Sequence, residues 1–206
     1  MSSDNGVTKI ENNIECLTII GQIEGHNLLS NQTKTTKYEH IIPKLIEFEE
    51  NKDSRGLLIC INTVGGDVEA GLAIAELISG LSKPTVSIVL GGGHSIGVPL
   101  AVAANHSFIV PSATMTLHPV RTNGLIIGAP QVFQYFNKLQ DSIYNFIVSH
   151  SKTDIKTLRK LMFDTDEIAN DIGTVLFGEE TVKYGIIDDV GTISDAISKL
   201  KELIKE

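Results

Sequence analysis

The chain has 206 residues, a formal net charge of −8, 42% apolar residues, no Trp and two cysteines. This length suits one domain with a sizeable core, and the acidic balance argues against nucleic acid as a partner, because phosphate binding needs clustered Lys and Arg. No apolar run approaches the ~20 residues of a membrane-spanning helix. Cys16 and Cys60 lie in apolar runs and are predicted to be reduced. The polar first residues are unlike a signal peptide, so we expect a cytoplasmic protein.

Strands and helices are predicted to alternate along residues 15–206, which we expect to form one domain after a flexible segment at 1–14. The predicted elements, in chain order, are strand 16–23, helix 38–49, strand 56–62, helix 68–81, strand 85–90, helix 96–104, strands 107–110 and 114–117, helices 130–151 and 154–162, strand 175–177, helix 179–184, strand 186–187 and helix 193–205. Because the strands are nearly all apolar, this pattern predicts an α/β fold with a parallel sheet covered on both faces.

Two glycine turns, Gly65-Gly66 and Gly91-Gly92-Gly93, each follow a predicted buried strand and precede a helix. The carboxyl ends of parallel strands meet at one edge of a sheet, where α/β folds place their ligand sites. Neither turn has the spacing of a dinucleotide fingerprint or a P-loop. The two turns fit an oxyanion hole better than a phosphate-binding loop, because an oxyanion hole needs two backbone N–H groups that approach the ligand closely and no side chain.

Ser95 follows the second glycine turn, at a predicted junction of strand, turn and helix. A helix N-terminus offers unpaired N–H groups and a partial positive charge, which suits a nucleophile because acyl transfer develops negative charge. The alternative is an ordinary serine N-cap.

A serine nucleophile needs a base, and usually an acid to orient that base. His118 ends the predicted strand 114–117 and is held extended by Pro119, so it can point toward the same edge. His94 adjoins Ser95 but is a poor base, because neighbouring side chains at a tight turn diverge. The remaining histidines, His26, His40, His106 and His150, lie in contexts typical of the surface.

The orienting acid is expected in the acidic connection before the strand at residue 175. Asp171 is best placed against the sheet edge, with Asp164 and Asp166 as rivals. Most acids in such a loop are solvated or act as caps.

Together these motifs resemble the proteolytic subunit family of the Clp protease, from about residue 19 to residue 196. The matching motifs are Ile19-Ile20-Gly21-Gln22-Ile23, the turn Ile61-Asn62-Thr63-Val64-Gly65-Gly66-Asp67-Val68-Glu69-Ala70-Gly71, the Ser95 turn, Met115-Thr116-Leu117-His118-Pro119 and Gly178-Glu179-Glu180-Thr181-Val182-Lys183-Tyr184-Gly185-Ile186-Ile187-Asp188. The sequences around Ser95 and Asp171 are more similar to the translocation-enhancing branch of that family than to its housekeeping proteases.

The resemblance implies a ClpP/crotonase-like spiral of ββα units in a single domain, with 130–151 as a protruding handle helix. It implies an ATP-dependent serine endopeptidase that works without a cofactor or metal in a homo-oligomeric ring, with an AAA+ unfoldase as a partner. The implied site has Ser95 as nucleophile, His118 as general base, Asp171 as orienting acid and the N–H groups of Gly66 and Ile96 as oxyanion hole. Residues 124–129 would form the extended substrate-binding strand.

Some positions depart from the family pattern. His94 stands where the family usually has Ala, and counting back from Tyr184 without a gap puts Gly173 at the acid position. These departures leave open a catalytically weak or inactive ClpP-like ring that binds polypeptide and assists protein translocation. A crotonase-type acyl-CoA enzyme is a third reading, against which the pair of Ser95 and His118 argues.

Overall fold

The computed structural model describes residues 7–10, 13–122, 127–165 and 172–205. The elements, in chain order, are β1 (Val7–Ile10), β2 (Ile14–Glu24), β3 (Thr35–Lys37), α1 (Tyr38–Glu50), β4 (Gly56–Gly66), α2 (Val68–Ser79), β5 (Thr85–Gly93), α3 (Gly97–Val102), β6 (His106–Ile109), β7 (Thr114–Leu117), α4 (Ala129–Ser149), α5 (Ile155–Met162), β8 (Thr174–Phe177), α6 (Gly178–Lys183), β9 (Asp189–Val190) and α7 (Ile193–Leu203). The predicted alternation of strands and helices is confirmed as a mixed α/β domain with a mainly parallel sheet.

The main sheet has the strand order β1-β2-β4-β5-β6-β9. From β2 to β9 in this order, neighbouring strands run parallel. Strand β1 lies inside the segment 1–14, which the sequence predicts to be flexible, and pairs antiparallel with β2. Strands β7 and β8 pair antiparallel with each other, and β7 contacts β5 where Gly92 pairs with Thr114. This arrangement brings the ends of β4, β5 and β7 together.

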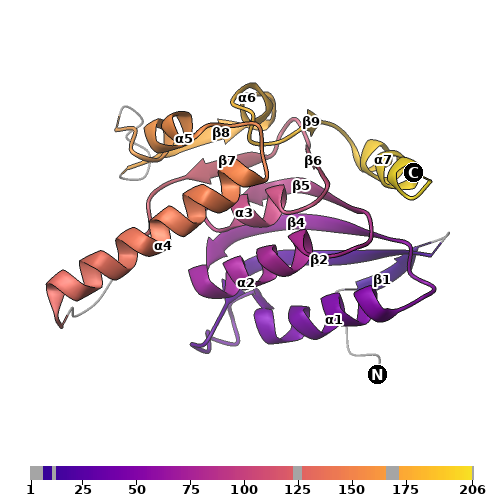
Figure 1. Cartoon of the computed structure of the whole chain (residues 1–206), viewed down its shortest axis with the longest axis horizontal. Helices are drawn as coiled ribbons and strands as arrows, with labels where there is room; N and C mark the ends of the chain where they lie inside the picture. The colour runs from indigo at the N-terminus through magenta and orange to yellow at the C-terminus, as the bar shows by residue number, and fades with distance from the viewer. Residues whose placement is uncertain (1–6, 11–12, 123–126, 166–171, 206) are drawn as a thin grey trace.

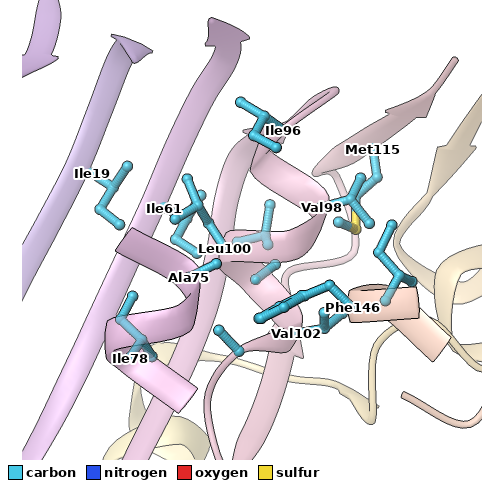
Figure 2. Close-up of a cluster of buried hydrophobic side chains, with 14 of the residues drawn as sticks. Ile19, Ile61, Ala75, Ile78, Ile96, Val98, Leu100, Val102, Met115 and Phe146 are labelled. Atoms are coloured by element: carbon cyan, nitrogen blue, oxygen red, sulfur yellow. The ribbon is translucent and has the colours of Figure 1, made fainter. Parts of the chain in front are cut away.

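Helices α1, α2 and α3 cover one face of the sheet; the C-terminal half of α4 packs beside α3, and its N-terminal half projects away from the sheet (Figure 1). Figure 2 shows how side chains from β4, α2, α3 and α4 meet in this core, with Phe146 of α4 packed near Val102. Every residue of α3 is buried. The Ser95 turn therefore leads into a helix that is fixed by packing on several sides.

The opposite face of the sheet is only partly covered, which corrects the expectation that both faces are buried. Helix α7 packs Ala196 and Leu200 against Leu58 and neighbouring side chains, but Ile20 and Leu90 near the strand ends remain exposed. At ~1.5 Å per residue α7 spans roughly 16 Å, whereas β4 at ~3.3 Å per residue spans roughly 36 Å. The helix is too short to cover the whole face.

The predicted strand at 186–187 is wrong, because the last strand is β9 at Asp189–Val190. The N–H groups of Ile186 and Ile187 donate to the carbonyl of Thr181 and close the end of α6, while both side chains are buried. These two isoleucines therefore pack into the core after α6 and do not pair with another strand. In the described part of the chain, no helix is long and apolar enough to cross a membrane.

Candidate active site

Ser95 lies in a strained turn between β5 and α3. Its φ is +57°, and Asn13 is the only other non-glycine residue with positive φ in the described chain. This left-handed conformation costs roughly 1–2 kcal/mol for an L-residue. The N-cap of α3 is Ile96 and makes no side-chain capping bond, so the N-cap interpretation of Ser95 is wrong. The turn has the geometry of a nucleophile elbow, where a strained serine stands between a strand and a helix.

Glycine is required at position 65 because the backbone there lies very close to the Ser95 turn. A Cβ added at Gly65, whose φ is +91°, would lie 2.8 Å from Cβ of Ser95 and 2.9 Å from the carbonyl oxygen of His94. A Cβ at Gly66 would collide with the carbonyl oxygen of Ile23 on the adjacent strand. The two glycines therefore let the end of β4 pass between β2 and the serine turn.

Two backbone N–H groups beside Ser95 are candidates for binding an oxyanion. In the described chain nothing accepts a hydrogen bond from the N–H of Ile96, although the next two N–H groups of the turn are bonded. The N–H of Asp67 donates to Ile23 on β2 at 3.0 Å. Since N–H groups alternate along a strand, the N–H of Gly66 points away from β2.

A cavity of about 130 Å³ brings four of the predicted site residues together. Its lining comprises Gly66, Val68, Ser95, Ile96, Leu117, His118, Pro119, Val120, Arg121, Ile143 and Met162. The predicted nucleophile, base and both N–H donors thus share one mostly apolar space. Asp171 and its rival Asp166 lie outside the described residues.

His118 is half-buried at the end of β7. Its Nδ1 lies 2.7 Å from the carbonyl oxygen of Pro119; a carbonyl only accepts, so Nδ1–H is the donor and Nε2 carries the lone pair of the neutral ring. Burial lowers the pKa of His118; the Pro119 bond opposes this and the nearby Arg121 adds to it, and the net direction is downward. No described residue hydrogen-bonds to Nε2 of His118 or to Oγ of Ser95.

The residue beside His118 across the β7–β8 pair is a glycine. The ladder ends with Leu117 opposite Thr174, and a Cβ built on the next residue, Gly173, would lie 2.9 Å from Cβ of His118. Gly173 has a φ of +126° and donates its N–H to the carbonyl of Asp164 at 2.9 Å. The described chain therefore offers no carboxylate at position 173.

Three contributors to the site were not found by sequence reasoning. The carbonyl of Thr116 accepts the N–H of Ser95 at 2.8 Å, the Asn62 side chain accepts the N–H of Gly92 at 2.9 Å, and a guanidinium N–H of Arg121 donates to the carbonyl of Ile172 at 3.2 Å. Thr116 could have been noticed, because it lies two residues before His118 on the same strand face.

The predicted substrate-binding strand at 124–129 can be compared with the structure only in part. Residues 124–126 lie outside the described chain, Ile127 is 82% exposed, and Ala129 already belongs to α4. A second groove of about 470 Å³ runs from Pro119 and Val120, which also line the first cavity, along Val132, Phe133 and Phe136 of α4.

Comparison with known proteins places this site in a family context. The model of the family "Clp protease" matches residues 11–194. The chain is 57% identical to the translocation-enhancing protein TepA of Halalkalibacterium halodurans, over 95% of its own length and 77% of that relative. It is 25% identical to the ATP-dependent Clp protease proteolytic subunit of Leuconostoc citreum, over 81% of its own length and 82% of that relative.

Proposed function

The chain belongs to the Clp protease family, and from this premise we propose that it is a serine endopeptidase with Ser95 as its nucleophile. The observation that carries the proposal is the strained Ser95 turn, which opens into the same cavity as His118 and the N–H groups of Gly66 and Ile96. A strained serine, a histidine with a free ring nitrogen and two backbone donors are the parts that acyl transfer needs.

In the proposed reaction, Oγ of Ser95 attacks the carbonyl carbon of the peptide bond while Nε2 of His118 takes the hydroxyl proton. The negative charge on the carbonyl oxygen is bound by the N–H groups of Gly66 and Ile96. His118 then gives the proton to the leaving amine, and a water molecule activated by the same ring hydrolyses the acyl-enzyme. Before substrate binds, the Nδ1–H of His118 is held by the carbonyl of Pro119, which leaves Nε2 free to take this proton.

Substrate binding or assembly has to bring Ser95 and His118 into contact, since no hydrogen bond joins them in the free chain. Catalytic hydrogen bonds are often long in unliganded enzymes and tighten when substrate binds. Asp171 is the proposed orienting acid, and it would have to replace the Pro119 carbonyl as acceptor of the Nδ1 proton.

The substrate is proposed to be an extended polypeptide. The Ser95 cavity continues at Pro119 and Val120 into an apolar groove, so a chain bound at Ser95 can extend past these two residues. By analogy with its family, the chain is proposed to act in the cytoplasm as an oligomeric ring supplied by an ATP-dependent unfoldase. The name of the TepA relative suggests protein translocation as the process served.

Hydrolysis of an unstructured polypeptide, followed by mass spectrometry of the products, tests the proposal. We expect cleavage by the wild-type protein and a loss of ~10⁴-fold or more in Ser95→Ala and His118→Ala. Asp171→Asn should also lose most activity, whereas Asp164→Asn and Asp166→Asn should retain it. A wild-type protein that binds the polypeptide without cleaving it, under all assembly conditions, would favour the inactive ring.

A further inference from the structure

His94 precedes Ser95 and its side chain turns back toward the neighbouring strand β7. Its Nδ1 shares a hydrogen bond of 2.8 Å with Oγ1 of Thr116. The imidazole lies over Gly92, since a Cβ built on that glycine would approach Nε2 of His94 to 2.6 Å. The middle glycine of the turn therefore makes room for the ring.

Thr116 is also the residue that holds the main chain of Ser95. Its carbonyl accepts the N–H of Ser95 at 2.8 Å while its hydroxyl bonds to His94, so both groups of one residue engage the turn. Thr116 lies in β7, two residues before His118, which directly follows this strand. The turn with the nucleophile is thus attached by two adjacent bonds to the strand that carries the base.

From this geometry we infer that His94 is a positioning residue, whose bond to Thr116 holds the Ser95 turn in its left-handed conformation against β7. The inference deepens the proposed function, on which its kinetic consequence rests. His94 does not exchange a proton with Ser95 in this role, and it needs only the hydrogen-bonding atom at the Nδ1 position. The amide of Asn places a polar atom near that position, whereas the amide of Gln reaches only the Nε2 position.

The strain at Ser95 explains why a second attachment is useful. A non-glycine residue at φ +57° tends to relax unless its surroundings fix it. The carbonyl of Thr116 holds the N–H of Ser95, and the hydroxyl of Thr116 holds the side chain of His94, the residue before Ser95. Burial lowers the pKa of His94, and the nearby His118 lowers it further, so the ring is neutral at pH 7. It can therefore keep this bond without adding a positive charge beside the base.

The test compares His94→Gln with His94→Asn by two measurements on the full chain. The first is the rate at which a fluorophosphonate labels Ser95, and the second is amide hydrogen exchange of peptides that contain residues 93–97. We expect His94→Gln to slow labelling by ~10- to 100-fold, since misplacement by about 1 Å costs up to ~10²-fold, and to speed exchange in the turn. His94→Asn should restore both values to near those of the wild type.

Thr116→Val removes the other partner and should match His94→Gln, while the double variant should lose little more, because the two residues share one bond. Thr116→Val also carries the test if His94→Gln does not fold. His40→Gln, on the exposed face of α1, is the matched control.

Wild-type labelling speed in both His94→Gln and Thr116→Val overturns the inference, even if exchange rises. Failure of the wild type to be labelled contradicts the proposed function instead. In that case exchange alone decides the structural part: faster exchange in His94→Gln but not in His94→Asn supports the attachment, and equal exchange in all variants refutes it.

Discussion

At the scale of single residues, the protonation state of His118 is set by its burial and by two neighbouring groups. Its burial disfavours the charged ring, the carbonyl of Pro119 favours it, and the guanidinium of Arg121 disfavours it again. The net result is a pKa below 6.5, so the ring is neutral and able to accept a proton at pH 7. The contribution of Arg121 can be tested by substitution.

The pH dependence of Ser95 labelling should therefore rise through a midpoint below 6.5 and be flat above it, because only neutral His118 acts as base. Arg121→Gln removes a nearby positive charge and should move this midpoint to higher pH. Arg121→Lys keeps the charge and should leave the midpoint close to that of the wild type. The measurement is the labelling rate between pH 5 and 8; a midpoint that falls in Arg121→Gln would contradict this account.

Sequence reasoning proposed Ser95 and His118 because both carry local signals: a glycine turn after an apolar strand, and a histidine at a strand end before proline. It did not reach Thr116 or the Pro119 carbonyl, since their roles depend on how β7 lies against the β5–α3 turn. The hydrogen bonds that backbone groups make cannot be inferred from the amino-acid types at those positions. The same limit applies to Gly173, whose place beside His118 follows only from the β7–β8 register.

At the scale of elements, Asp188 joins segments that are far apart in the chain. Its carboxylate accepts the N–H and the hydroxyl proton of Ser107 on β6 at 3.0 and 2.9 Å, and it pairs with Lys152 before α5 at 2.9 Å. Burial raises the pKa of Asp188, but Lys152, Ser107 and His106 outweigh this and hold the pKa below 3.8. The interactions fix the connection that leads into β9.

Asp188→Ala should lower the free energy of unfolding by about 2–3 kcal/mol, because the buried polar groups of Ser107 lose a charged acceptor. Asp189→Ala is the matched control; this exposed residue pairs with His106 and should cost less than about 1 kcal/mol. Since the folded pKa is depressed, the stability from Asp188 is present above pH ~4 and is lost as pH falls through the lower folded value. Urea unfolding at pH 7 and pH 3 measures both effects, and equal costs for the two variants would refute them.

Most elements were predictable because apolar strands and amphipathic helices have distinct periods, as in α1 and β7. Strands β1, β3 and β9 were missed because they are two to four residues long and contain Thr, Lys or Asp. Such strands are defined by the neighbour that they pair with, here β2 and β6. These strands form only because of pairing in the folded chain, so the local sequence pattern does not predict them.

At the scale of the whole molecule, helix α4 projects from the rest of the chain (Figure 1). Apolar side chains of this helix and of the groove beside it are exposed in the single chain. Phe133 is 69% exposed, and Phe163 lines the same groove with 51% exposure. Exposed apolar patches of this kind mark contact surfaces. Together with the family membership, they support assembly into an oligomer.

Phe133→Glu should shift the protein from an oligomer toward the 22.3 kDa single chain, because a buried unpaired carboxylate at an interface is costly. Gln134→Glu adds the same charge at the neighbouring exposed position and should disturb assembly less. Sedimentation velocity distinguishes the species. A wild-type protein that sediments as a single chain at all concentrations would contradict the assembly prediction.

The account depends most on Ser95 being the residue that forms a covalent bond with substrate. Intact-mass and peptide mass spectrometry after treatment with a fluorophosphonate measures this directly. We predict one adduct per wild-type chain, located on Ser95, with none in Ser95→Ala and a much slower reaction in His118→Ala. An adduct that forms equally in wild type and Ser95→Ala, or that maps to another residue, would contradict it.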